Sequence, residues 1–508
     1  MPPTHIKRSN DLSIQLVNPA TPLYPGSVVL GHIVRKSHIV APNATIRVRL
    51  LGRAKAKLVI DRGNNSKSYY RSRFNFWREG AIADVVHHGP IHVAQGAGEE
   101  QSWPFALALP THTDAAAVNA GLSENERAAC FLHAPGDPQG KLGVPEQPLP
   151  GSFFFEHSGF GKSWHGFVEY WLEAELRVEG KSKIIEATMP LRVWSVPSPS
   201  PPMTDFGLTG RMMNGLVSTQ RLIPGMEDAK LSFKQKSQKF FGSSKVPNFH
   251  FSMRVEYPTQ IQLGNPYTIP FRLRITPNRE KSSEVIQDVP QKAYIKSSKL
   301  EVHSTVGVIC PGTFDSHEGS KTRKLCIGRT SKFVNEVDGF EIPCAPKEDM
   351  LDLGAVLGLQ IDARSAVVGA SKFGGGTLET MSPTYTTYCV RLSHVLHWEV
   401  KVSIGGESWE CGWQNRIAVH PPVEEALSGG VGAASAGMAT LSLEPPPPPV
   451  DEAVPAYEGP STAAPAYEKV AGGQASNEVN ARRLNGNVGA RASKGQLIYL
   501  SIMMEEDE

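Results

Sequence analysis

The stretch HGFVEYWLEAELRVEG, residues 165–180, alternates apolar and charged side chains with a period of two. One set of alternate positions is apolar: Val168, Tyr170, Leu172, Ala174, Leu176 and Val178. The other set holds Glu169, Glu173, Glu175 and Arg177. Successive side chains of a β-strand point to opposite faces, so the pattern predicts a strand with one face on a core and one in water. Such strands are typical of antiparallel sheets.

The same period recurs over most of the chain before residue 421. The first block contains GSVVLGHIVRK (26–36), ATIRVRLLGRAKAKLVI (44–60) and MPLRVWSV (189–196). The second block contains NFHFSMRVEYP (248–258), YTIPFRLRIT (267–276), AYIKSSKLEVHSTVGVIC (293–310) and TYCVRLSHVLHWEVKVSI (387–404). No long amphipathic helix is expected. The pattern predicts an all-β fold of two immunoglobulin-like β-sandwich domains, at residues 12–196 and 246–420.

Three segments interrupt the strand pattern. Residues 112–150 are rich in Gly, Pro and polar side chains and predict an inserted loop, with a short helix at SENERAACFLH (123–133). Residues 197–245 begin with PSPSPP and predict a linker that carries a basic stretch. Residues 421–508 are rich in Ala, Gly, Ser, Pro and Glu. Because they offer too little apolar surface to offset the entropy of ordering, a disordered Pro-rich tail is expected there.

Charge is distributed unevenly behind a formal net charge of +2. Residues 421–508 carry 12 acidic and 5 basic side chains, against 38 and 47 in residues 1–420. The basic body favours acidic partners such as anionic lipid or phosphorylated peptides, but its excess is too small to predict nucleic-acid binding. Cysteines are few and widely spaced, with no C-x-x-C pair, so neither a zinc cage nor a dithiol site is predicted.

Membrane-directing signals are not apparent in the sequence. The first residues, MPPTHIKRSNDLSIQL, lack the apolar run of a signal peptide. No stretch reaches the ~18 consecutive apolar residues that span a bilayer. A cytoplasmic protein with reduced thiols is expected.

Several stretches, taken in order, resemble the arrestin family. PLYPGSVVLGHI (22–33), IRVRLLGRAKAKL (46–58), SWPFALALP (102–110) and LPGSFFFEH (149–157) with WHGFVEYWLEAEL (164–176) are similar to strands of its N-terminal domain. SMRVEYPTQIQLGNPYTIPFRLRIT (252–276) resembles the opening of its C-terminal domain, with Leu263-Gly264-Asn265-Pro266 where the family has Pro-Gly. The resemblance implies an arrestin fold over most of residues 12–420. Within the family it is to alpha-arrestins of the fungal type, adaptors that bring WW-domain ubiquitin ligases to membrane proteins, which are then endocytosed.

The stretch VPAYEGPSTAAPAYEKV (454–470) contains Pro-Ala-Tyr-Glu twice. A WW domain takes a proline in polyproline II form and the tyrosine two residues later, so this repeat predicts two binding motifs. The family motif is Pro-Pro-x-Tyr or Leu-Pro-x-Tyr. The candidate residues here are Val454, Pro455 and Tyr457, and Ala464, Pro465 and Tyr467. Val454 retains an apolar contact, so the first copy should bind better. The alternative is a Pro/Ala-rich spacer that contains two tyrosines.

Two further segments have open interpretations. The first is a proline run, Pro445, Pro446, Pro447, Pro448 and Pro449, which is either a polyproline ligand or a stiff spacer. The second is the basic stretch with Lys230, Lys234, Lys236 and Lys239, interleaved with Leu and Phe. It is either a membrane-surface patch, which anionic lipid would attract by roughly 1 kcal/mol per lysine, or a solvated linker segment.

No catalytic, cofactor or metal-binding motif is predicted. GFGKS (159–163) lacks the glycine that a phosphate loop needs at 156, which is Glu, and a strand follows it. His87, His88 and His92 in HHGPIH have no nearby carboxylate or cysteine partner in sequence. His394 and His397 are three apart on a predicted strand and so face opposite sides. All five histidines are interpreted as packed or surface residues.

The sequence therefore predicts a non-enzymatic adaptor without a cofactor. It would link cytosolic segments of membrane transporters or receptors to a HECT-type WW-domain ubiquitin ligase, and so promote ubiquitination, endocytosis and sorting. Its place would be cytoplasmic, peripherally at the plasma membrane or endosomes. One alternative is a trafficking scaffold of the same fold, similar to the retromer's arrestin-like subunit, with no ligase recruitment. Another is a binding module that delivers a polyproline tail to cytoskeletal or signalling partners.

Overall fold

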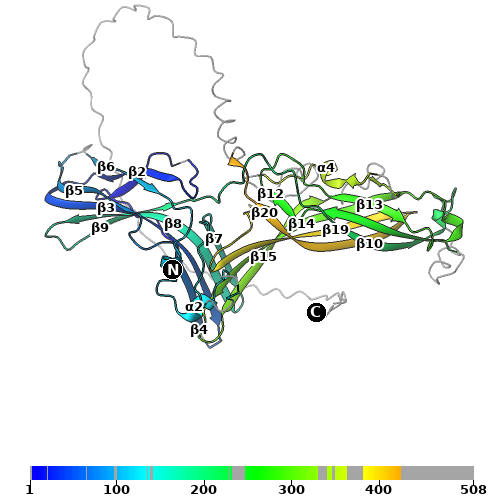
Figure 1. The fold of residues 1–508 in the computed structure, drawn as a ribbon, viewed down its shortest axis with the longest axis horizontal. Helices are drawn as coiled ribbons and strands as arrows, with labels where there is room; N and C mark the ends of the chain where they lie inside the picture. Colours follow the sequence, from blue (N-terminus) through cyan, green and yellow to red (C-terminus); the bar gives the residue numbers. More distant parts are fainter. Residues whose placement is uncertain are drawn as a thin grey trace, which may run out of the picture. The chain divides into compact units, whose positions relative to one another are not determined.

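Antiparallel β-strands make up most of the chain that the structure, a computed structural model, describes (Figure 1). The described residues are 3–19, 21–64, 66–96, 100–133, 136–137, 141–227, 229–230, 246–329, 340–345, 349–362 and 381–424. The prediction of a mostly β-sheet protein with sandwich character is confirmed. The predicted tail lies outside these residues beyond position 424, so its state stays a prediction.

Two sheets enclose the first hydrophobic core. One has the order β1-β2-β6, formed by Ser13–Leu16, Val28–Arg35 and Gln101–Ala108. The other has the order β4-β3-β8-β7, formed by Lys67–Asn75, Ile39–Asp61, Lys162–Val178 and Phe153–Gly159. To this second sheet, β5 (Ala83–Val93) adds by pairing with β3, and β9 (Ile185–Leu191) by pairing with β8. The stretches that resemble arrestin strands contribute β2, β3, β6, β7 and β8.

Two further sheets enclose the second core. One has the order β10-β11-β13-β17, formed by Thr209–Ser218, Asn248–Tyr257, Arg272–Pro277 and Leu351–Asp352. The other has the order β12-β20-β19-β14-β15, formed by Gln260–Gln262, Glu407–His420, Val390–Ile404, Ala293–Cys310 and His317–Arg329. Two short strands join this sheet: β16 (Glu341–Ile342) pairs with β14 and β18 (Tyr385–Thr386) with β19.

Helices are short in the described part of the chain. They are α1 (Ala115–Asn119), α2 (Glu124–Ala128) and α4 (Leu353–Leu357), with 3-10 turns η1 (Gln220–Leu222) and η2 (Glu284–Ile286). The helix predicted at 123–133 is confirmed over its first half. It starts with a capping box, in which Glu126 N–H donates to the Ser123 hydroxyl and Ser123 N–H donates to the Glu126 carboxylate at 2.8 Å.

The longest strand pair of the second sandwich takes part in both cores. Leu300 and Val302 of β14 and Trp398 of β19 are buried in the second core. Toward the other end of the same pair, Val308 and Val390 are buried in the first core. The described residues 3–424 accordingly fall in one compact unit, Met1–Leu441.

Polar contacts accompany this shared packing. The Ser72 hydroxyl donates to the carbonyl of Ile309 at 2.8 Å. The Tyr388 hydroxyl lies 2.7 Å from that of Thr113 and donates to the carbonyl of Pro145 at 3.0 Å. Thr113 and Pro145 belong to the segment between β6 and β7, which was predicted as an inserted loop. That segment is therefore tied to the second block through a buried tyrosine.

Two expectations about local structure need correction. The segment predicted as a linker contains β10, a ten-residue strand paired with β11. Its sequence, TGRMMNGLVS, includes two glycines and little alternation, so tertiary pairing rather than local propensity defines the strand. The charged face of β8 was expected in water, yet Glu175 is buried and pairs with Arg49. Carboxylates can be shielded in this way because arginines on β3 lie opposite them.

Candidate functional site

The outer face of β3 changes its charge balance along its length. Alternate residues of β3 point away from the core, from Arg47 to Val59. Toward the start of the strand, these cations lie opposite glutamates of β8, with Arg49 paired to Glu173 and Arg53 to Glu169. The ion-pair distances are 2.7 Å for Arg49–Glu173 and 2.5 Å for Arg53–Glu169. In this half of the face, Arg49 and Arg53 each have a carboxylate partner on β8.

Beyond Arg53, the cross-strand partners of β3 are no longer acidic. Lys55 lies opposite Phe167 on β8 and Arg73 on β4. Lys57 lies opposite His165 and Arg71. Among the described residues, no carboxylate forms an ion pair with Lys57, Arg71 or Arg73. We name these four side chains, Lys55, Lys57, Arg71 and Arg73, the β3–β4 basic face.

Lys55 shows the electrostatic cost of this arrangement. Its side chain is buried, with 8% of the residue exposed. Burial and, to a smaller extent, the neighbouring charges of Arg53 and Arg73 together lower the pKa of Lys55 to about 8, against the opposing attraction of Glu169. A lysine in this position gains from an added negative charge nearby, since that charge would favour its protonated form.

Aromatic side chains border the β3–β4 basic face. Tyr69, about half exposed, stacks beneath two of its cations, with Lys57 Nζ at 5.3 Å and the Arg71 guanidinium at 5.7 Å from the ring centroid. Beside Lys57 is a hollow of about 360 Å³, lined also by Phe154 and His165 and, on its far side from β3, by one acidic residue, Glu156 of β7. Arginines and lysines in such a setting bind carboxylates and phosphates, and arginine offers two parallel N–H donors to each. The face is suited to an anionic ligand.

A larger hollow lies beside the edge strand β1. Its volume is about 600 Å³ and its lining is mainly apolar, including Val17, Val28 and Leu30. These three side chains are about half exposed. The Arg192 guanidinium stacks on Trp194 at 4.3 Å from the ring centroid at its rim. This groove offers apolar contact area, whereas the β3–β4 basic face offers charge.

The residues predicted to bind partners lie almost entirely outside the described residues. This applies to both Pro-x-Tyr motifs, to the proline run 445–449 and to Lys234, Lys236 and Lys239. Lys230 is described and exposed, next to Ala229, whose carbonyl accepts a hydrogen bond from Arg221 at 3.1 Å. The predicted binding motifs and the membrane-surface patch therefore stay predictions.

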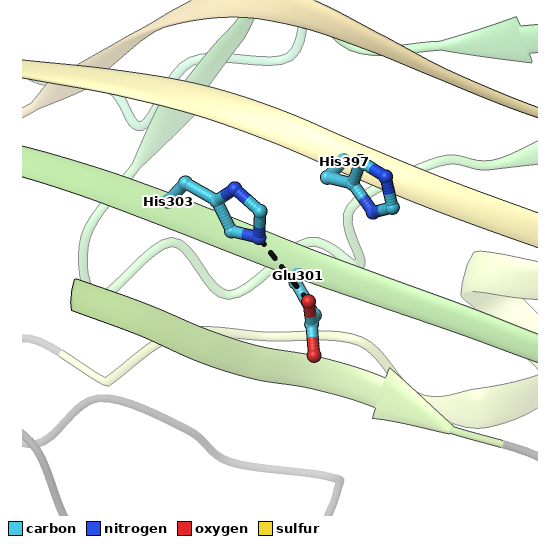
Figure 2. A group of neighbouring side chains, drawn as sticks. All are labelled: Glu301, His303 and His397. Carbon is cyan, nitrogen blue, oxygen red and sulfur yellow. Dashed lines mark hydrogen bonds and ion pairs between the residues drawn. The ribbon is translucent and has the colours of Figure 1, made fainter. Parts of the chain in front are cut away.

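Of the five histidines noted in the sequence, His92 is exposed on β5 and the other four make contacts of different kinds. His88 makes a 3.0 Å hydrogen bond with the Thr45 hydroxyl, and His87 makes one with the Pro90 carbonyl at 3.2 Å. His394 is buried, and burial lowers its pKa to about 4. His397 points to the opposite side of β19, as predicted. It lies beside Glu301 and His303 of β14 (Figure 2), a grouping that sequence reasoning missed.

The sequence contained only part of the information needed to predict that Glu301, His303 and His397 lie together. Glu301 and His303 are two apart on a predicted strand, so they were bound to share one face. His397 becomes their neighbour only because β14 and β19 pair in a register that places it opposite Glu301. Among the described residues, these three are the group whose ligand atoms lie within 4.8 Å of one another.

The cysteines are free thiols. Burial raises the pKa of Cys130 to about 12 and that of Cys310 to about 11. Burial also raises the pKa of Cys389 well above its ordinary value. Such thiols stay protonated near neutral pH, which makes them poor nucleophiles.

Comparison with known proteins gives no family assignment. No protein-family model matches the chain, and no curated protein matches it. Among the described residues, no helix is long and apolar enough to cross a membrane. The resemblance to arrestins therefore stays an interpretation of the sequence stretches quoted above.

Proposed function

We propose that this protein is an arrestin-fold adaptor of the alpha-arrestin type, which brings a HECT-type WW-domain ubiquitin ligase to membrane-protein cargo. Its site of action would be cytoplasmic, at the plasma membrane or endosomes. The observation that carries the proposal is the repeated Pro-x-Tyr at 455–457 and 465–467, attached to an all-β body. Support for the fold comes from the first core, since each stretch that resembles an N-terminal arrestin strand forms a strand or strand pair there.

The cargo half of the proposal is assigned to the β3–β4 basic face. Acidic or phosphorylated cytosolic segments match its cations Lys57, Arg71 and Arg73, which form no ion pair with a described carboxylate. The aromatic ring of Tyr69 adds contact area beside two of these cations. Charge of this kind steers encounter and gives specificity, and it weakens with rising salt.

The ligase half is assigned to the tail. Each Pro-x-Tyr motif is a short ligand with a preformed backbone preference, so little entropy is lost on binding a WW domain. Two motifs ten residues apart engage a ligase with several WW domains at once, and avidity raises the apparent affinity by about 10²-fold. Val454 makes the first motif the stronger of the two.

The decisive experiment uses the full chain immobilised against a multi-WW fragment of a HECT-type ligase. Tyr457→Ala with Tyr467→Ala should abolish capture, because both tyrosine pockets are left unfilled. Tyr499→Ala is a matched control, since this tail tyrosine follows no proline at the required spacing. Unchanged capture with the double variant would contradict ligase recruitment and favour the trafficking scaffold.

A further arm separates the polyproline alternative. Replacing Pro446, Pro447 and Pro448 by alanine leaves both Pro-x-Tyr motifs intact. The adaptor proposal expects capture of the WW fragment to persist. Capture that depends on the proline run and not on the tyrosines would favour the binding module for cytoskeletal or signalling partners.

A further inference from the structure

Three metal-ligand side chains meet on the outer face of the second sandwich (Figure 2). Glu301 and His303 extend from the same face of β14, and His397 extends from β19 at the position opposite Glu301. Glu301 Oε2 lies 3.1 Å from His303 Nε2. The two imidazole rings are nearly parallel, at 8° with 5.2 Å between their centroids.

The cluster is partly shielded from water. Side-chain exposure is 12% for Glu301, 17% for His303 and 27% for His397. Within the described part of the chain, His397 Nδ1 is buried and has no hydrogen-bond partner. A buried ring nitrogen without a partner carries a desolvation cost that a bound cation would remove.

The donor set is one that zinc uses. Two imidazoles and one carboxylate bind Zn²⁺ at bond lengths of about 2.0–2.2 Å, which places tetrahedral ligand atoms roughly 3.3 Å apart. The Glu301–His303 separation of 3.1 Å already matches this spacing. All three ligand atoms lie within 4.8 Å of one another, so rotations of the side chains can close the remainder. Paired strands hold the three backbones in place, which limits the entropy lost on binding.

Two neighbouring charged residues should have opposite effects on the affinity of the cluster for a cation. Lys299 Nζ lies 2.9 Å from Glu301 Oε1, the carboxylate oxygen that does not contact His303. Glu399 Oε1 lies 3.8 Å from His397 Nε2. Lys299 orients the carboxylate while opposing an added cation, and Glu399 contributes a second negative charge. Contacts of this type around the ligands tune metal affinity.

We propose that Glu301, His303 and His397 form a zinc site that fastens β14 to β19 on the outer face of the second sandwich. Three protein ligands leave a fourth position for water or for a donor atom of a bound partner. This site is independent of the proposed adaptor function, since it shares no residue with the β3–β4 basic face or the tail motifs.

The test measures zinc binding by the full chain after its metal is removed with a chelator. Competition with a chromophoric chelator should give one Zn²⁺ per chain. Glu301→Gln, His303→Gln and His397→Gln should each weaken binding about tenfold or more, since each removes one of three ligands. His88→Gln is the matched control, an exposed histidine on β5 that should leave binding unchanged. Cobalt(II) should give the visible absorption of a low-symmetry, nitrogen-ligated site in the wild type and in the His88→Gln control, and this absorption should be altered or lost in the three ligand variants.

A fourth variant distinguishes a metal site from a plain ion-pair network. Lys299→Met removes a cation beside Glu301, so zinc should bind on the order of tenfold more tightly. A network without metal would instead lose an ion pair and show no zinc effect. Thermal unfolding of each metal-free variant identifies any that fails to fold. The proposal is overturned if stoichiometric zinc binding is absent, or if it persists unchanged in all three ligand variants.

Discussion

The two ends of β3 differ in how the molecule treats positive charge. Near Arg49 and Arg53, each cation faces a glutamate of β8 at 2.5–2.7 Å. Near Lys55 and Lys57, the facing residues are Phe167 and His165, and the neighbours on β4 are two more cations. The first arrangement pairs the cations with carboxylates within the fold, whereas Lys57, Arg71 and Arg73 form no ion pair with a described carboxylate. We therefore expect the arginines of the first end to stabilise the sheet, and we propose binding only for the cations of the second end that have no described carboxylate partner.

Removing a carboxylate partner of Arg53 should cause the largest loss of unfolding free energy. Glu169→Gln removes the negative charge beside the Arg53 guanidinium, which is only 11% exposed, and replaces one of the two oxygens that accept from Arg53 and from the Thr4 N–H by an NH2 donor. Removal of one partner from a buried ion pair costs about 3 kcal/mol, so the unfolding free energy should fall by that amount. Urea unfolding of the purified variant measures it.

Arg71→Gln is the comparison within the same sheet. Arg71 is exposed and forms no ion pair with a described carboxylate, so its loss should change stability by at most about 0.5 kcal/mol. Equal losses for the two variants would show that the two ends of β3 do not differ in the way proposed.

Reversing charge at the unmatched end should affect binding rather than folding. Lys57→Glu with Arg71→Glu should weaken binding of an acidic or phosphoserine peptide by about tenfold or more at low salt. Fluorescence anisotropy with a labelled peptide measures the loss. Lys181→Glu with Lys183→Glu makes the same change in net charge on the turn between β8 and β9 and should leave binding nearly unchanged.

Two outcomes would change the interpretation of this peptide-binding experiment. If both double variants weaken the peptide equally, only net charge matters and the β3–β4 basic face is no specific site. If the peptide does not bind the wild type but vesicles with anionic lipid do, the face recognises a membrane surface instead.

The smallest effect concerns the titration of Lys55. Its pKa is lowered to about 8 from 10.5, so between these values the unfolded chain binds more protons than the folded chain. The unfolding free energy should therefore rise with pH across this window, by about 1 kcal/mol after allowance for solvent screening. Lys55→Met should flatten the rise, which urea unfolding at pH 7.5 and 10 will detect. A wild-type curve as flat as that of the variant would contradict the lowered pKa.

Local pattern was sufficient for the strands but not for their partners. The apolar positions of β8, from Val168 to Val178, follow a strict period of two and are buried as predicted. The glutamates between them were assigned to water, because only the register with β3 reveals the facing arginines. The same limit applies to His397, whose neighbours are set by the β14–β19 pairing. The period of apolar residues identifies which face of a strand is buried. The register between paired strands decides which side chains become neighbours.

The segments that are proposed to bind partners differ in how far sequence alone can identify them. Pro-x-Tyr motifs act through a few consecutive residues, so sequence alone can propose them. The β3–β4 basic face combines residues of two strands and depends on what β8 lacks beside them. The sequence does not distinguish Lys55 from other strand lysines, because its burial and its neighbour Arg73 on β4 depend on the tertiary structure.

The β14–β19 pair also bears on how the protein can be divided. A fragment ending near residue 196 would lose the side chains that β14 and β19 place in the first core, among them Val306, Val308 and Leu392. It would also lose Tyr388, and with it the hydroxyl that bonds to Thr113 and Pro145. Cutting the chain at the Pro-rich segment after β9 would thus expose buried apolar residues on both fragments. Binding studies therefore need both sandwiches in one polypeptide.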